Sequence, residues 1–588
     1  MPSFQNINLD ATGSVVGGDG KWRSNDLQAN AGALNVAWDL PNQYTDNSKL
    51  FPKTYIVKYG TNSGGPYTNA VDMSLDDDPA MLRKTITGTS SGVTYYCVVQ
   101  SVDSEGFVSA ESSEVAIVSA VPSVAADPVV YTEIRQVDLP YTINASGDYR
   151  IMENLTYDVN DSPGILITAS DVKLFAASAD SIVYTVCNLN DSIGVELSGA
   201  LSTIEIFGFH ITVGTRVYSS AINHGHIYAS NAGNSIDGLV VRSMEFTTGQ
   251  PNQNQLNGTG TSGGVILRSP NGIGYIVEAY NNTFNIRGTG YGSISGISVG
   301  TGGTSRSVIV HDNIFNCSDA SGTSAGYQRP VNNADEAYGN TFNITSCSFT
   351  AYGMVGLGNT PYTHGNTFNV TASNSVRCII DAENTTARVH LYNTLNVIST
   401  AGVSGEVRLY RCRFGANDCI YGYSTMDGNN QLLSSTLFDV YGTQPEYGDT
   451  RNNYVYHNTV TNTNKGIIHV LEQAENTYLW GNNADTTNVY GAFLRSAASG
   501  ENANGLYFDG DSIAGSTADV LLLTDGAWAA VENAHFAGLG AISISNNAPA
   551  NTVAETHYWV DGNAGLVTHT NRNTGTKTPK VPTNVRAA

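Results

Sequence analysis

Basic residues are scarce in this sequence. Lys and Arg together number 28 against 51 Asp and Glu, so the formal net charge over 588 residues is -23. Proteins that follow the phosphates of a nucleic acid use a basic stripe that releases counterions, and this sequence has no Lys/Arg cluster of that kind. The composition therefore excludes a nucleic-acid partner, and it disfavours an anionic membrane surface for the same reason.

Long apolar runs are also missing. No run is long enough to span a bilayer, and the first residues, MPSFQNINLDATGSVVGG, carry neither a positively charged segment nor an apolar one. We therefore expect a protein without membrane insertion and without a visible secretion signal.

Cysteines are few, odd in number and widely spaced, with no C-x-x-C pair. They are Cys97, Cys187, Cys317, Cys347, Cys378, Cys412 and Cys419. This pattern predicts reduced core thiols in place of a disulfide framework or a zinc site. Synthesis in a reducing cytoplasm fits it, followed by release through lysis or by assembly into a particle.

Signals for metals and cofactors are equally weak. The oxygen-rich segments 76–78 and 509–511 are not followed by a spaced calcium loop, and no phosphate-binding glycine loop stands out. We expect no metal and no cofactor.

Short β-type runs fill residues 33–119 and are bounded by Gly, Pro, Asn or Asp. These runs are LNVAWDLP, KTYIVKYG, KTITG and VTYYCVVQSVDSEGFVS. The region resembles a fibronectin type III domain, with Trp38 at the early-strand core position and Tyr95 as a tyrosine-corner residue. Residues 1–32 are then an N-terminal extension, and the Val/Ala/Pro-rich residues 120–146 a linker.

A repeat begins after the linker. Pairs of Asn and an apolar residue two positions later recur at spacings of about 20 to 30 residues, the length of one β-helical coil. The pairs are Asn282/Phe284, Asn313/Phe315, Asn340/Phe342, Asn366/Phe368, Asn393/Leu395 and Asn458/Val460. Short apolar strands lie between them, often after a glycine such as Gly264 or Gly296. Stacked coils would align like residues into internal ladders, so we expect the asparagine amides to bond between coils at a turn.

Two segments resemble known proteins of this type. In the first, a G-x-Y-x-h-x-x-N-L-T run precedes G-I-x-I-x-A-x-x-V-x-L, as in the opening coil of right-handed parallel β-helices of the pectate-lyase-like superfamily. The matching residues are Gly147, Tyr149, Asn154, Leu155 and Thr156, then Gly164, Ile165, Ile167, Ala169, Val172 and Leu174. In the second, Gly565, Val567, Thr568, Gly575 and Thr576 resemble the closing segment of phage and bacterial β-helix proteins.

The resemblance implies an all-β chain. A right-handed parallel β-helix over residues 147–576 would follow the fibronectin type III-like β-sandwich, and residues 577–588 would form a Pro-containing tail that could begin another sandwich.

A β-helix offers a long shallow groove, which suits an extended polymer better than a compact cofactor. Tyr410, Tyr421 and Tyr423 lie close together in the sequence, and aromatic faces stack on sugar rings. These tyrosines are therefore candidate substrate-binding residues. The alternative is that Tyr simply suits strands and half-buried surfaces.

A glycosidase on this scaffold needs two carboxylates across the scissile bond. Asp381 and Glu383 follow the strand RCII, and Glu472 follows the strand GIIHV, so these three are candidate acids or bases. Arg377 and His469 lie on the same two strands and are candidate substrate-binding residues. The alternative is that the carboxylates are solvated turn residues of an acidic protein.

Known catalytic sets are absent. The sequence has neither the N-T-D, D-D, H-G and R-I-K set of polygalacturonase-type hydrolases nor the Asp-and-Arg pattern of pectate lyases. The resemblance therefore implies a fold and leaves the question of enzyme activity open.

Three functions stay open. The first is a virion surface protein of a tailed phage, tailspike-like or fibre-like, that binds a host cell-surface polysaccharide and contacts other virion proteins through its N-terminal domain. The second is an active polysaccharide depolymerase, a glycoside hydrolase or lyase, on the same β-helix. The third is a bacterial adhesin or structural fibre subunit. Resemblance to tailspikes also implies a homotrimer.

Overall fold

The computed structural model describes part of the chain. The described residues are 7–9, 15–17, 22–23, 33–39, 54–73, 83–102, 108–119, 130–157, 159, 162–176, 182–186, 193–213, 224–229, 235–248, 261–267, 275–288, 293–299, 307–319, 330–347, 351–355, 362–372, 376–380, 388–399, 407–413, 419–427, 435–441, 450–462, 468–470, 474–480, 482–485, 490–496, 503–509, 512–514, 518–524, 531–532, 535–537, 542–546, 559–561 and 583–587.

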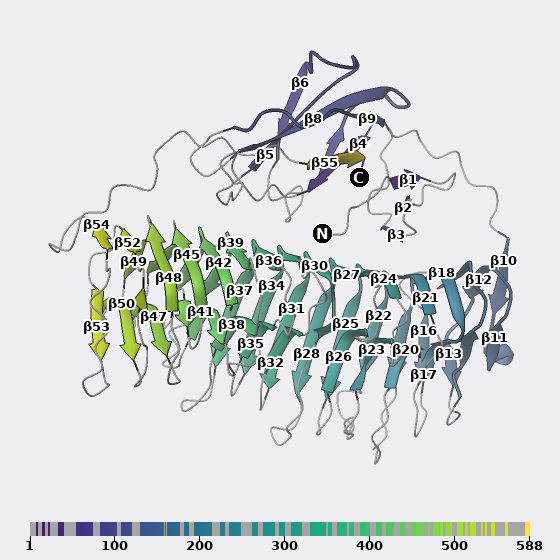
Figure 1. The fold of residues 1–588 in the computed structure, drawn as a ribbon. Helices are drawn as coiled ribbons and strands as arrows, with labels where there is room; N and C mark the ends of the chain where they lie inside the picture. The colour runs from purple at the N-terminus through teal and green to yellow at the C-terminus, as the bar shows by residue number, and fades with distance from the viewer. Residues whose placement is uncertain are drawn as a thin grey trace. The chain divides into compact units, whose positions relative to one another are not determined.

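The chain divides into two compact units (Figure 1). One comprises Met1–Val130 with Thr570–Ala588, and the other comprises Tyr131–His569. Among the described residues, secondary structure is strand throughout apart from one short 3-10 helix, Gln136–Asp138. This confirms the all-β prediction. In the same part of the chain, no helix has the length and apolar character needed to cross a bilayer.

The first unit contains two antiparallel sheets from the predicted sandwich region. Strands β4 (Ala33–Asp39) and β7 (Arg83–Thr87) pair in one sheet. The other sheet has the order β6-β5-β8-β9. Its strands are β5 (Thr54–Gly60), β6 (Asn69–Asp72), β8 (Thr94–Val102) and β9 (Val115–Val118). A small third sheet lies in the predicted N-terminal extension and comprises β1 (Ile7–Leu9), β2 (Val15–Gly17) and β3 (Trp22–Arg23).

Buried aromatic side chains join the two larger sheets. The Trp38 ring on β4 packs on the Tyr55 ring on β5 with centroids 5.1 Å apart, and each side chain is 1% exposed. The Tyr95 hydroxyl accepts a hydrogen bond of 3.0 Å from the Ser90 backbone N–H, five residues upstream, which is the contact a tyrosine corner makes. The fibronectin type III assignment itself stays a prediction.

The C-terminal tail belongs to the first unit. Thr583–Ala587 forms strand β55, which pairs antiparallel with β4 on the side opposite β7. The sequence predicts that this segment could begin a further sandwich, whereas in the structure it adds a strand to the sheet formed by β4 and β7. The edge of β4 explains the difference, because its unpaired backbone groups accept any strand that reaches them.

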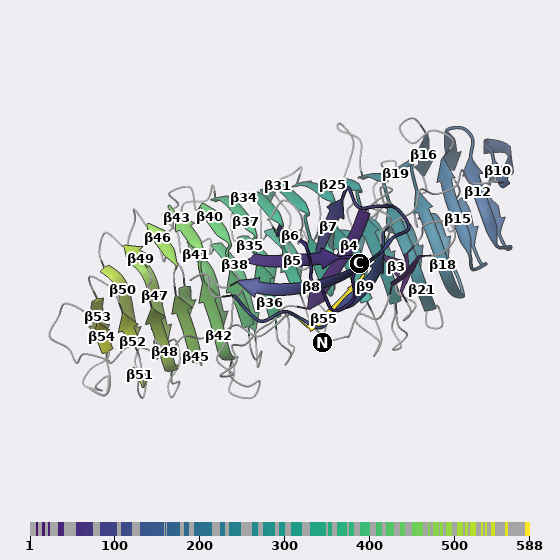
Figure 2. The ribbon, with the colours of Figure 1, turned by 90° about the horizontal axis from the view of Figure 1, so that it is seen from above.

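The second unit is a stack of coils built from three parallel sheets of 17, 15 and 13 strands (Figures 1 and 2). Apart from the two ends of the 17-strand sheet, the neighbour of a strand in each sheet is the third strand along the chain, so each coil adds one strand to each sheet. An example is the order β24 (Tyr275–Tyr280), β27 (Ser307–His311) and β30 (Glu336–Tyr338). We call them the 17-strand, 15-strand and 13-strand sheets. This arrangement confirms the parallel β-helix prediction.

The coils begin earlier than the sequence predicted. Strands β10 (Tyr131–Ile134) and β11 (Tyr141–Ile143) lie within the predicted linker 120–146, and they pair with β12 (Gly147–Ile151) and β14 (Ile165–Ile167) of the coils that follow. Prolines around these short strands gave the segment a linker-like composition. Ile134 and Ile143 are nevertheless fully buried in the core, which explains why the strands form. The predicted closing segment, residues 565–576, lies outside the described residues.

The repeated T-F-N-I type sequences determine which side chains of the 13-strand sheet face the core. In β31 (Thr341–Cys347) and β34 (Thr367–Ala372), Phe342 and Phe368 point into the core and are fully buried. Period-2 alternation then places the residues on either side outward. The inward rings stack in an uninterrupted column, with centroids 4.6 to 4.9 Å apart. The column comprises Phe246, Phe284, Phe315, Phe342 and Phe368.

Glycine in the 15-strand sheet makes room for this column. A Cβ added at Gly296, on β26 (Ser293–Val299), would lie 2.5 Å from Cε1 of Phe315 and 2.9 Å from the Pro330 carbonyl oxygen. Gly264 and Gly353 face Phe284 and Phe368 in the same way. The glycine that often precedes the apolar strands in the sequence is therefore a packing requirement.

We expect Gly296→Ala to lower the free energy of unfolding of the β-helix by about 1 to 3 kcal/mol, because an added methyl group overpacks the core. Urea unfolding followed by circular dichroism measures the loss. Combining it with Phe315→Leu should give a loss smaller than the sum of the two single losses. Additive losses would contradict the contact.

Candidate functional site

The three nominated carboxylates, Asp381, Glu383 and Glu472, lie outside the described residues. They stay predictions.

Three of the nominated binding residues lie on one sheet, the 15-strand sheet. Arg377 is on β35 (Val376–Ile380), Tyr410 on β38 (Val407–Arg413) and His469 on β44 (Ile468–Val470). By backbone register, Arg377 pairs with Arg408, and Tyr410 continues a row whose described members Val331 and Met354 are fully buried. His469 follows Asp439 and Arg411 in another row.

The nominated tyrosines do not share a sheet. Tyr421 is on β39 (Cys419–Gly422) of the 17-strand sheet, and Tyr423 lies on the turn that follows it. The Tyr423 ring stacks between those of Tyr392 and His457, with centroids 5.0 and 5.3 Å away. All three residues have positive φ, between 50° and 56°, which is unusual for bulky side chains. These rings are half-buried and cover the turn between two sheets in successive coils.

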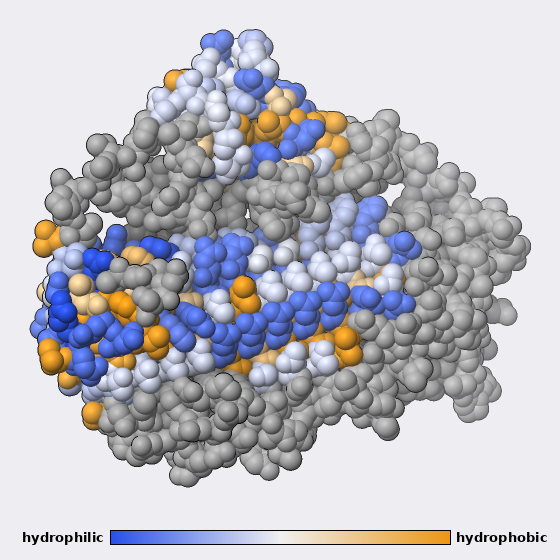
Figure 3. All heavy atoms as spheres, turned by 180° about the vertical axis from the view of Figure 1, so that it is seen from behind, coloured by the Kyte–Doolittle hydropathy of each residue, from blue (hydrophilic) through white to orange (hydrophobic). Residues whose placement is uncertain are grey.

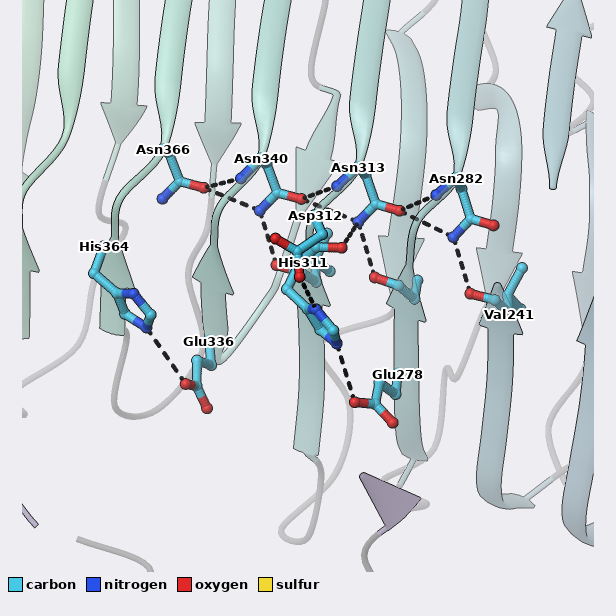
Figure 4. Close-up of polar contacts among 12 residues, drawn as sticks. Val241, Glu278, Asn282, His311, Asp312, Asn313, Glu336, Asn340, His364 and Asn366 are labelled. Atoms are coloured by element: carbon cyan, nitrogen blue, oxygen red, sulfur yellow. Dashed lines mark hydrogen bonds and ion pairs between the residues drawn. The ribbon is translucent and has the colours of Figure 1, made fainter. Parts of the chain in front are cut away.

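An asparagine ladder lines the inside of this turn, as the sequence predicted (Figure 4). The amide of Asn340 shows the pattern. Its Oδ1 accepts from the backbone N–H and the Nδ2 of Asn313, while its own Nδ2 donates to Asn366 Oδ1 and to the Val310 carbonyl, over distances of 2.8 to 3.1 Å. Ladder neighbours are 26 to 31 residues apart in sequence, which is one coil. The ladder is therefore structural.

A second polar cluster lies beside the ladder, on the 17-strand sheet, and the sequence analysis missed it. His311, on β27 (Ser307–His311), holds Glu278 Oε1 at 3.1 Å through Nε2 and Asp312 Oδ2 at 2.7 Å through Nδ1. One coil pair further on, His364 Nε2 lies 3.5 Å from Glu336 Oε1 (Figure 4). We call these five residues the His–carboxylate cluster.

The cluster is held by aromatic stacking. Tyr280, His311, Tyr338 and His364 occupy one register row, and their ring centroids are 4.5 to 4.9 Å apart with nearly parallel planes. The sequence contained a signal for this row, since Tyr and His alternate two residues before Asn282, Asn313, Asn340 and Asn366.

Burial and charge act against each other at His311. Burial alone would lower its pKa, but the hydrogen bonds and charges of Asp312 and Glu278 outweigh burial and raise the pKa to about 9. The imidazolium is thus the favoured form in the folded protein at neutral pH. Chemically it is a buried proton donor held between two carboxylates.

The His311 pKa leads to a pH prediction. Because the folded value is above the ordinary value near 6.5, its stabilisation is complete below about pH 6.5 and is lost as pH rises through about 9. The full effect is on the order of 3 kcal/mol, from the size of the shift. We expect the urea concentration at the midpoint of β-helix unfolding to decrease as the pH is raised from 6.5 to 9.5. The decrease should be smaller in His311→Gln. An equal fall in that variant would contradict the assignment.

Access decides what the His–carboxylate cluster can do. Glu278 is 4% exposed, His311 1% and His364 0%. An acid–base pair that acts on a polysaccharide must reach the glycosidic oxygen, and these buried groups offer no such contact. The cluster is therefore better suited to holding the coils together than to catalysis.

No group of three or more His, Cys, Asp or Glu suited to holding a metal ion occurs among the described residues. The described thiols of Cys97, Cys317 and Cys378 are buried and form no disulfide. Burial, and then the charge of Glu114, raises the pKa of Cys97 to about 12, which makes this thiol unreactive.

Comparisons with known proteins add little to the geometry. No family model matches the chain, and no curated protein sequence matches it. Among solved structures, a family 28 exopolygalacturonase from Yersinia enterocolitica is 10% identical, covers 88% of this chain and 99% of its own, and has a TM-score of 0.25. A pectate lyase from Pectobacterium carotovorum is 12% identical, covers 50% of this chain and 88% of its own, and has a TM-score of 0.15.

Proposed function

We propose that this protein is a virion surface protein of a tailed phage, tailspike-like or fibre-like, that binds a polysaccharide on the host cell. One observation carries the proposal. Three parallel sheets of 17, 15 and 13 strands stack coil on coil, and in the 13-strand sheet Thr, apolar and Asn side chains recur in register from one coil to the next. Such linear arrays offer equivalent contacts at regular intervals, which suits a linear polymer with repeating units better than a compact ligand.

Charge narrows the choice of polymer. With a net charge of -23 the protein repels nucleic acids, whose binding depends on phosphate neutralisation. An uncharged polysaccharide is an extended polymer that avoids this repulsion, and its hydroxyl groups form hydrogen bonds with uncharged side chains. Buried thiols outside disulfides at Cys97, Cys317 and Cys378 support synthesis in a reducing compartment before assembly into a particle.

Binding is favoured over cleavage. Glu278, His311 and His364 of the His–carboxylate cluster are buried, so these groups do not support the depolymerase alternative, which depends on Asp381, Glu383 and Glu472. The adhesin or structural fibre alternative shares the scaffold and differs in its partner.

Adsorption to cells tests the proposal. Fluorescently labelled protein is mixed with encapsulated bacteria of several capsule types and with matched strains that lack capsule or O-polysaccharide. We expect binding to the cells of at least one glycan type and none to its glycan-deficient match. Equal binding to both would contradict polysaccharide recognition.

A further inference from the structure

A second row of asparagines lies on the outer face of the 13-strand sheet. It comprises Asn285, Asn316, Asn343, Asn369 and Asn396, which are in direct register on neighbouring strands. The strands are β25 (Thr283–Gly288), β28 (Ile314–Asp319), β31, β34 and β37 (Thr394–Ser399). Each asparagine follows an inward apolar residue, so its side chain is on the solvent side and is partly or fully exposed.

Hydrogen bonds give this outer row a fixed direction. The Nδ2 of each asparagine donates to Oδ1 of the one in the preceding coil over 2.8 to 2.9 Å, and Asn285 donates to Glu245 Oε1 over 2.8 Å. An amide has two N–H donors and two lone pairs. Each amide from Asn285 to Asn369 thus uses one donor and one acceptor along this outer row and keeps a second of each for a ligand.

A row of hydroxyls runs beside the amides, two positions earlier on the same strands. Thr283, Thr341, Thr367, Thr394 and Thr425 occupy this row, with Ile314 as the one interruption between Thr283 and Thr425. We call the two rows together the Thr/Asn stripe. Figure 3 shows hydrophilic side chains gathered in a continuous stripe along this face of the described coils.

We propose that the Thr/Asn stripe is the glycan-binding face and that its ligand is a neutral, hydroxyl-rich polysaccharide. The inference rests on the proposed function and adds the site and the class of glycan. The stripe repeats once per coil, at about 4.8 Å, a step comparable to one sugar unit of an extended chain. Its amides are already oriented by the hydrogen bonds along the outer row, so binding a ligand costs little side-chain entropy.

Charge complementarity selects a neutral glycan. The Asn and Thr side chains of the stripe are uncharged, while carboxylates lie at its two ends, Glu245 in the Thr row and Asp427 in the Asn row. A polyanionic glycan along the stripe would meet these carboxylates and the field of a protein with net charge -23. Hydroxyl groups of a neutral glycan bond to amides and threonines without that penalty.

The experiment places charge on the Thr/Asn stripe and leaves the asparagines of its outer row unchanged. The double variant Thr341→Glu/Thr367→Glu does this, and Thr341→Ala/Thr367→Ala removes the hydroxyls alone. The matched control is Thr132→Glu/Thr142→Glu, because these two threonines are exposed and lie on the other two sheets, on β10 and β11. Binding of the full chain to immobilised laminarin, dextran, mannan, polygalacturonate and extracted bacterial polysaccharides is measured by biolayer interferometry.

We expect wild type and control to bind a neutral glycan equally, the alanine variant to bind several-fold more weakly, and the stripe glutamate variant to lose at least ten-fold in affinity while unfolding like wild type. Wild-type affinity in both stripe variants, or a preference for polygalacturonate, overturns this inference and leaves the proposed function standing. Absence of wild-type binding to every glycan overturns both.

Discussion

Phe368→Asp is expected to abolish cooperative folding of the central coils. The side chain is fully buried, and its ring stacks on Phe342 at 4.6 Å and lies against Gly353. Removing a buried Phe ring costs about 3 to 5 kcal/mol, and burying an unpaired carboxylate adds to the loss. The total exceeds about 5 kcal/mol, which is comparable to the whole stability of many domains. Urea unfolding and limited proteolysis of the purified chain report the loss.

The matched control is Ile398→Asp in the neighbouring coil of the same sheet. Ile398 is 41% exposed, so its replacement by Asp should change the unfolding midpoint little. Wild-type-like unfolding of Phe368→Asp, or equal losses in the two variants, would overturn the register in which Phe368 faces the core.

Asn340→Leu is expected to cause the next largest loss, on the order of 3 to 5 kcal/mol. Leu has a similar size but offers no polar atoms, so the Val310 carbonyl, the Asn313 backbone N–H and the facing amides lose bonds inside the core. Each buried polar group left without its bond costs about 1 to 3 kcal/mol. Chemical unfolding measures the loss. The control is Asn343→Leu on the outer row, where water replaces the lost bonds; losses of equal size would contradict a buried ladder.

The opposite change extends the ladder. At the ladder position of the next coil, Ser424 accepts from the Asn393 backbone N–H at 3.1 Å, and the buried Nδ2 of Asn393 has no hydrogen-bond partner. Ser424→Asn would supply an amide oxygen there. We expect a gain of about 0.5 to 1.5 kcal/mol in unfolding free energy. A loss of stability would show that the turn beside Tyr423 has no room for the amide.

The interior of the β-helix was predictable because its signal repeats. Asn-x-Phe pairs one coil apart identify both the turn ladder and the inward ring column, and both are present around Asn340 and Phe342. A repeat averages out local ambiguity, since each coil carries the same constraint. The first coils were missed because β10 and β11 are short strands among prolines, with no repeat before them to set the register.

Other features depend on contacts between distant segments. Nothing local in Thr583–Ala587 indicates that it pairs with β4, more than 540 residues earlier in the chain. The His–carboxylate cluster likewise combines Glu278 and His311 from adjacent coils. Its Tyr and His alternation was visible, but whether those rings were exposed or buried was not. The nominated tyrosines show the same limit. Tyr410 and Tyr421 are close in sequence, but they lie on different sheets.

The His–carboxylate cluster and the Thr/Asn stripe have two different roles. Buried charge holds coils together, whereas exposed uncharged groups are available to a ligand. This division supports a protein that holds a glycan, whereas the depolymerase alternative depends on Asp381, Glu383 and Glu472.

One measurement tests polysaccharide binding without cleavage most directly. The purified full chain is incubated with a panel of bacterial surface polysaccharides, and retained protein, product size and new reducing ends are measured on the same samples. We expect retention on at least one glycan with no change in its size. Fragments of one defined length with new reducing ends would make the protein a depolymerase, and absence of retention on any glycan would contradict polysaccharide binding.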